Sequence, residues 1–209
     1  MSKKLMRLSE VSDDQMVDII SSEVMGDSEK DGAIELVGKA VAGLATVASG
    51  GDNKLLKTRL SQYIGLLRGM QLWYHAAHHV TRGTGFFGDH ADAYGGFYEA
   101  LTEDFDSAVE KAIGLTNDEE MANPCKITEM ALQVLHKFPC PPTLTALALA
   151  SAALEMEKAH NELVSAMFHE LESAGCLTLG LDDMLMATVN DHEGHIYKLQ
   201  QRVKTELEN

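Results

Sequence analysis

Histidine is concentrated in two short parts of this chain, and imidazole is a common ligand of transition metals in proteins. Of nine histidines, four lie between residues 75 and 90 and two more stand at residues 192 and 195. His75 and His78 are three residues apart and would share a helical face, whereas His79 would turn about 100° away. Imidazoles beside carboxylates can bind divalent iron, zinc or manganese, although helix histidines are also ordinary surface or core residues.

A stripe of carboxylates follows the first histidines. Its members are spaced by four, three and four residues and are Glu99, Glu103, Asp106 and Glu110. This spacing places all four on one face of a helix, which is also the pattern of a solvated helix surface. Residues 53–88, which carry three of the histidines, contain no Asp or Glu. A metal site on those histidines therefore needs carboxylates from elsewhere.

Two further motifs each match part of a known metal centre. A di-iron centre inside one bundle takes a Glu from each of two helices and a Glu-x-x-His from each of the other two. Glu157 and His160 form one such motif, but His192-Glu193-Gly194-His195 does not form a second. The latter is also one residue shorter than the His-Glu-x-x-His motif of zinc proteases. We therefore expect a di-iron centre within a single bundle to be incomplete.

Hydrophobic periodicity and chain breakers predict an all-α fold. Four long helices are expected at residues 53–80, 89–115, 143–173 and 182–208, with a shorter helix at 127–137. Asp89 is the expected N-cap of the second helix. At 1.5 Å per residue the long helices would be about 40–46 Å long, which suits an antiparallel four-helix bundle. The short helix would lie in the crossover between the two helix pairs.

The chain divides into a bundle at residues 53–209 and a different segment at 1–52. This first segment is expected to be a helical extension packed on the bundle, or an arm that docks on another protein. The sequence Ser49-Gly50-Gly51 is typical of a hinge between the two.

Charge and cysteine content restrict the partners and the compartment. With 17 basic and 32 acidic residues the formal net charge is −15, which repels nucleic acid and attracts cations. DNA binding is expected to be weak, since Lys3, Lys4 and Arg7 alone make the N-terminal residues basic. Three cysteines do not form a disulfide framework, and neither a secretory signal nor an 18-residue apolar run is present. We expect a cytoplasmic protein without a membrane segment, or one inside a larger cytoplasmic or viral assembly.

Residues 78–90 read His-His-Val-Thr-Arg-Gly-Thr-Gly-Phe-Phe-Gly-Asp-His. This order, with a second histidine twelve positions after the first, resembles the Dps mini-ferritins of the ferritin-like superfamily. In that family an Asp-x-x-x-Glu pair follows on the second helix, and Asp106 with Glu110 matches it. Residues 183–185 and 191–199 resemble the family's fourth helix. The resemblance covers about residues 53–208 and leaves the N-terminal extension outside.

The resemblance implies a ferritin-like four-helix bundle that assembles into a homododecamer with an internal cavity. Iron-oxidising sites would lie between subunits related by a twofold axis, with His78 and His90 from one chain and Asp106 and Glu110 from its mate. The implied function is iron storage with ferroxidase activity, in which peroxide or oxygen oxidises non-haem Fe(II) and the cell is protected against oxidative damage. The iron centre could be mononuclear or di-iron, zinc or manganese could replace iron, and no catalytic residue beyond the metal ligands is implied.

The chain departs from the family pattern at several positions. His90 and Asp106 are sixteen residues apart, one more than is usual in the family, and a π-bulge at Gly95-Gly96 would absorb the extra residue. Tyr94 occupies a position that is often acidic in the family. Additional candidate ligands are Tyr94, Asp92 and Glu103. Asp182 and Asp183 match a region near the family's threefold pores and could draw cations inward, or they could be ordinary carboxylates at a helix start.

A second interpretation comes from another class of protein. The chain would then be a Dps-like structural or docking protein with a weakened iron site, attached to a larger assembly through residues 1–52. Loading with ferrous iron and peroxide separates the two interpretations, because a structural protein would form no iron core.

Overall fold

The structure, a computed structural model, describes residues 53–207 of the chain. These residues are helical with short connections, and no strand occurs among them, which confirms the prediction of an all-α fold. The predicted extension or docking arm at residues 1–52 lies outside the described residues. None of the helices between residues 53 and 207 combines the length and the apolar character that crossing a bilayer requires.

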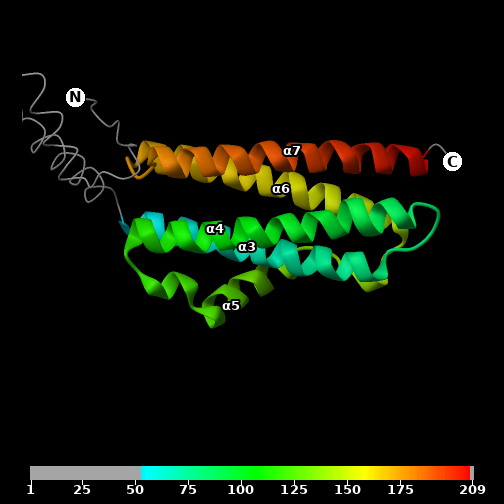
Figure 1. The fold of residues 1–209 in the computed structure, drawn as a ribbon, viewed down its shortest axis with the longest axis horizontal. Coiled ribbons are helices and arrows are strands. Elements are labelled where there is room, and N and C mark those ends of the chain that lie inside the picture. Colours follow the sequence, from blue (N-terminus) through cyan, green and yellow to red (C-terminus); the bar gives the residue numbers. More distant parts are fainter. Residues whose placement is uncertain (1–52, 208–209) are drawn as a thin grey trace, which may run out of the picture. The chain divides into compact units, whose positions relative to one another are not determined.

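Four long helices form two antiparallel pairs. They are α3 (Asn53–Val80), α4 (Gly96–Thr116), α6 (Ala146–Ser173) and α7 (Leu179–Leu207). Helix α3 packs along α4, α6 packs along α7, and the two pairs meet through α3 with α6 and α4 with α7. In Figure 1, α3 and α7 run from left to right while α4 and α6 run from right to left. A long crossover must therefore join α4 to α6.

The crossover carries the predicted short helix, α5 (Pro124–Leu135), between two 3-10 turns, η3 (Glu119–Ala122) and η4 (Pro141–Thr143). Helix α5 packs on the side of α3. Gly69 of α3 permits this contact, because a Cβ atom there would lie 2.8 Å from the Cβ of Val134. The side chain of Trp73 anchors the far end of the crossover by donating a hydrogen bond from Nε1 to the carbonyl oxygen of Pro139 at 2.9 Å.

Local capping explains where these helices begin. Asn123 accepts a hydrogen bond from the backbone N–H of Cys125 at 3.0 Å and starts α5. Thr145 accepts one from Ala148 at 3.3 Å and starts α6 three residues after the predicted start. Asn117, in the left-handed conformation with φ of 49°, ends α4.

The start of the second helix differs from the prediction. Asp89 is not an N-cap, because the backbone is already helical before it and Phe87 precedes the first regular turn. Its buried carboxylate instead accepts hydrogen bonds from Nε of Arg202 at 2.9 and 3.0 Å, joining the beginning of this segment to the end of α7.

A π-helix, η2 (Gly88–Gly95), precedes α4 directly. The sequence predicted a π-type distortion here to absorb one extra residue, and the distortion is present. It covers eight residues that end at Gly95, whereas the prediction placed a single bulge at Gly95-Gly96. Wider helical turns of this kind are uncommon and often occur beside functional residues.

Candidate metal centres

A cluster of one carboxylate and two imidazoles lies between α6 and α7. Glu157 comes from α6, and His192 and His195 come from successive turns of α7. Ligand atoms of the three residues all lie within 4.8 Å of one another, so the group could hold a metal ion. The side chains of Glu157 and His192 are 0% and 1% exposed and that of His195 is 13% exposed, so the cluster belongs to the core.

Glu157 is the centre of this cluster. One carboxylate oxygen, Oε2, lies 2.5 Å from Nδ1 of His192 and 3.5 Å from Nδ1 of His195. The other, Oε1, accepts a hydrogen bond from the hydroxyl of Tyr74 on α3 at 2.5 Å. A buried carboxylate requires such partners, since an unpaired charge in the core is very costly.

The electrostatics follow from burial and these contacts. Burial by itself would raise the pKa of Glu157, but the hydrogen bond from His192 and the attraction of the positive charges of His192 and of His195, 3.5 Å away, outweigh it and lower the pKa to about 2. Burial, followed by the negative charge of Glu157, raises the pKa of Tyr74 well above its usual value, so Tyr74 remains a hydrogen-bond donor. Glu157 is therefore ionised at neutral pH.

His160 extends the cluster along α6. Its ring stacks on that of His192 with centroids 3.7 Å apart and planes 15° from parallel. Its Nδ1 lies 2.9 Å from Oδ1 of Asn161, an acceptor, so Nδ1 carries the proton and Nε2 has a lone pair. The Nε2 atoms of His160 and His192 are buried and have no hydrogen-bond partner within residues 53–207. Burial lowers the pKa of His160 to about 3 and keeps its ring neutral.

The remaining long helix, α4, contributes Asp104, which is half-buried. Burial raises the pKa of Asp104, and the charges of His192 and His195 partly oppose this. Together with Tyr74 and Glu157, this residue completes a polar interior to which all four long helices contribute. The two incomplete motifs of the sequence, at residues 157–160 and 192–195, thus meet inside one bundle. The sequence motifs do not predict this meeting, because a motif such as Glu-x-x-His does not contain which helical faces pack together.

The distances determine how a metal ion would fit. Metal–nitrogen and metal–oxygen bonds of about 2.0–2.2 Å place two ligands of a tetrahedral ion about 3.4 Å apart. The 3.5 Å separation of Glu157 and His195 already satisfies this, whereas the 2.5 Å separation of Glu157 and His192 is that of a hydrogen bond. An ion would replace the proton that His192 donates to Glu157 and would move the His192 ring by roughly 1 Å. The three ligands do not identify which metal would bind.

A second pair of imidazoles lies where α3 ends and η2 begins. Nδ1 of His78 is 2.7 Å from the carbonyl oxygen of His90, and Nδ1 of His90 is 2.9 Å from the carbonyl oxygen of His78. The rings stack with centroids 3.8 Å apart. Because a carbonyl can only accept, each Nδ1 carries a proton and each Nε2 has its lone pair available. This arrangement fixes the tautomer in the way that metal-binding histidines require.

Helix η2 makes this reciprocal pairing sterically possible. A Cβ atom on Gly95 would lie 2.6 Å from the carbonyl oxygen of His90 and 3.2 Å from Nδ1 of His78. Any residue larger than glycine would therefore displace one partner of the pair. The neighbouring Gly96 has no such restriction, since its nearest contact would be at 3.8 Å.

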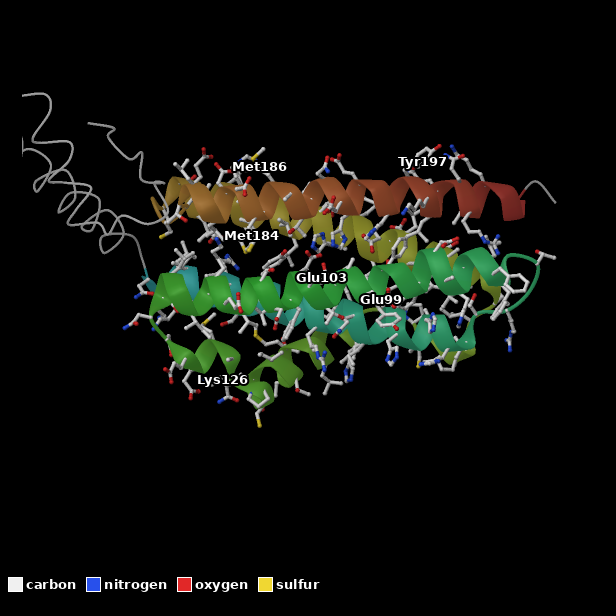
Figure 2. All side chains as sticks on the ribbon, viewed as in Figure 1. Glu99, Glu103, Lys126, Met184, Met186 and Tyr197 are labelled. Carbon is white, nitrogen blue, oxygen red and sulfur yellow. The ribbon has the colours of Figure 1, made fainter. Side chains whose placement is uncertain are left out.

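The carboxylates predicted to act with His78 and His90 are exposed on α4. Asp106 and Glu110 lie on the solvated face, as does Glu103, which Figure 2 labels with Glu99 on this helix. Within residues 53–207, Glu157 with His192 and His195 is the one group of three or more such ligands. His78 and His90 therefore form a pair of candidate ligands, and the described part of the chain brings no third ligand of this kind to them.

The remaining predicted ligands lie elsewhere. Tyr94 is 1% exposed and stacks on Tyr74 with centroids 6.2 Å apart, and burial raises its pKa. Asp92 is exposed near the end of α7, where it lines a shallow pocket with Lys198. Asp182 is half-buried and Asp183 exposed in the first turns of α7. Farther along α7, Met186 and Tyr197 point outward (Figure 2) and are 61% and 64% exposed.

One expectation about the histidines of α3 was wrong. His79 does not turn away from His75: its Nε2 lies 3.1 Å from Nε2 of His75. Residues four apart on a helix are separated by about 40° around the axis, which is less than the 60° between residues three apart. His78 turns toward His90 instead.

Comparison of the chain with protein-family models, with curated proteins and with solved structures finds no match.

Proposed function

We propose that this protein is an iron-oxidising, iron-storing bundle of the mini-ferritin type. The observation that carries the proposal is the reciprocal pairing of His78 and His90, which leaves two imidazole lone pairs available at one place. The order of helices, with a short helix in the long crossover, suits a ferritin-like bundle. This pair is a half-site that takes its carboxylates, Asp106 and Glu110, from a second copy of the chain.

The chemistry requires that Fe(II) bind before it is oxidised. Nε2 of His78 and of His90 bind the ferrous ion, and the carboxylates of the mate supply negative charge that favours the ferric product. Two ferrous ions give two electrons to one hydrogen peroxide, which takes up two protons and leaves as two waters. This reaction removes both reactants of hydroxyl-radical formation, and oxygen is the alternative oxidant.

The proposal includes a closed homo-oligomer, most simply a dodecamer, in which ferric oxide collects. The formal net charge of −15 attracts cations to such an assembly. Asp183 and Asp182, in the first turns of α7, are proposed to line the route of the cations inward. Zinc or manganese bound at the same histidines would inhibit the oxidation of iron.

The proposal is tested by adding peroxide to the full chain with ferrous iron. The absorbance of the ferric product then measures the rate of oxidation. The variants His78→Ala, Asp106→Asn and Glu110→Gln should each slow oxidation by about tenfold or more, because each removes a ligand. Glu103→Gln is the matched control on the same exposed face of α4, and its rate should stay that of the unmodified chain.

Equal rates in all four variants would contradict the proposal. A stable monomer that oxidises ferrous iron as fast as the unmodified chain does in its oligomer would also contradict the proposal. Absence of an iron core in the unmodified chain would favour the interpretation as a structural or docking protein of a larger assembly.

A second candidate function is metal binding in the bundle core, and a separate observation favours it. Glu157, His192 and His195 meet in the core, and three buried imidazole nitrogens there, Nε2 of His160, Nε2 of His192 and Nδ1 of His195, have no hydrogen-bond partner within residues 53–207. A metal ion at this cluster would stabilise the fold against heat, since it binds the folded chain alone. Added Zn²⁺, Mn²⁺ or Fe²⁺ should raise the unfolding temperature, and His192→Gln should reduce that rise clearly more than His78→Ala does, because the core site is lost only in the first variant. An equal rise in both variants would contradict a core site.

A further inference from the structure

His75 and His79 form an exposed pair one turn apart near the end of α3. Their Nε2 atoms are 3.1 Å apart, and their ring centroids are 4.7 Å apart with the planes 61° from parallel. This pair is separate from the His78–His90 half-site and from the buried cluster around Glu157. Neither the resemblance nor the proposed function gives it a role.

The separation of the two nitrogens is that of two ligands on one metal ion. Nitrogens at about 2.0–2.1 Å from a common ion are about 3.0 Å apart in square or octahedral geometry and about 3.4 Å apart in tetrahedral geometry. The observed 3.1 Å lies between these values. The distance between the two nitrogens therefore already suits an ion, which could replace the hydrogen bond between the rings once both rings turn their Nε2 lone pairs toward it.

Neighbouring rings hold the pair in this orientation. The ring of His75 packs against Tyr98 of α4, with centroids 4.9 Å apart. The ring of His79 packs edge-on against His78, with centroids 5.1 Å apart, and His78 is itself fixed by its hydrogen bond to His90. Ligands that are already oriented lose little conformational freedom when they bind, which strengthens binding.

We propose that His75 and His79 bind a divalent ion of the late first transition series, with water completing the coordination. Two imidazoles without a carboxylate favour Cu²⁺ above Ni²⁺ and Zn²⁺, and favour all three above Fe²⁺. The site is open to solvent, so the ion exchanges freely. The chain thus binds a copper-class ion beside the half-site proposed for iron.

Titration of the full chain with Cu²⁺, followed by calorimetry and by electron paramagnetic resonance, tests the site. His75→Ala and His79→Ala should each lose the same single binding event, or weaken it by about tenfold or more. The double variant should lose no more than either single variant, because the two residues share one ion. His169→Ala is the matched control: its side chain is 75% exposed on α6, and its copper binding should equal that of the unmodified chain.

Copper binding of equal number and affinity in the unmodified chain and both single variants would overturn the proposal. Loss of the site in His75→Ala but not in His79→Ala would also overturn it, since another residue would then be the second ligand. Both positions are exposed on a helix that favours alanine, so the variants should fold, which circular dichroism verifies. The result is independent of iron oxidation, which Cu²⁺ titration does not measure.

Discussion

Glu157 is the buried charge on which the polar interior depends. It accepts hydrogen bonds from Tyr74 and His192 and pairs with His195. In Glu157→Gln an amide N–H₂ would face the N–H of His192 or the hydroxyl of Tyr74, and the imidazoles would lose their counter-charge. We expect the free energy of unfolding to fall by about 3–5 kcal/mol, measured by urea denaturation with a chelator present.

The control for this substitution is Glu155→Gln on the same helix. Glu155 is 66% exposed and pairs with Lys158, and exposed pairs of this kind contribute about 0.5 kcal/mol or less. Similar losses in the two variants would show that Glu157 is not the centre of a buried network.

The depressed pKa values of His160 and Glu157 predict how stability depends on pH in the metal-free protein. Unfolded His160 binds a proton near its ordinary pKa of 6.5, but the folded residue does so only near 3. The contribution of His160 to the free energy of unfolding is therefore complete above about pH 6.5 and is lost as the pH falls toward 3. Glu157, with its pKa lowered from 4.5 to about 2, causes a second loss of stability as the pH falls below about 4.5.

Between pH 6 and 5 the contribution of His160 to the free energy of unfolding can be measured separately from that of Glu157. One proton taken up on unfolding gives a slope of about 1.4 kcal/mol per pH unit. In His160→Asn, which keeps a donor toward Asn161, the slope should be smaller by about this amount. His169→Asn, at a position 75% exposed, should leave the slope unchanged. Equal slopes in His160→Asn and the unmodified chain would show that His160 is not held neutral by burial.

At the scale of elements, η2 is the segment that positions the His78–His90 pair. Gly95→Ala would push a methyl group against the carbonyl of His90 and the ring of His78. We expect a loss of about 1–3 kcal/mol in stability, measured by urea denaturation, and weaker Fe²⁺ binding. Gly96→Ala has space for its methyl group and should be neutral or slightly stabilising. If Gly95→Ala matched Gly96→Ala in both measurements, the close packing around Gly95 would be disproved.

The sequence predicted the elements well because their signals are local. Leucine periodicity and the glycine-rich breaker define α3, which the structure has at the predicted residues Asn53–Val80. The other helix ends lie within three residues of the prediction when η2 is counted with α4, and caps such as Thr145 decide the start. The role of Asp89 was predicted wrongly because its partner, Arg202, lies 113 residues away in the sequence.

At the scale of the whole molecule, the sequence showed which residues can bind metals but not which of them meet. The sequence predicted His78 and His90 as members of one site. In the structure the ring of His78 contacts the backbone carbonyl of His90 and the two rings stack. The meeting of Glu157 with His192 and His195 depends on how α6 and α7 are rotated against each other. No local pattern contains that rotation, because tertiary packing of both helices determines it.

The central claim is that each iron site is shared between two copies of the chain. His78→Ala and Asp106→Asn chains, each slower alone by about tenfold or more, should complement one another when they are refolded together. In a mixed twofold pair one site carries both substitutions and the other carries neither. An equal mixture should therefore recover about a quarter of the ferrous oxidation rate of the unmodified chain. A mixture that remains as slow as its two components, although mixed pairs form, would contradict a site shared between subunits.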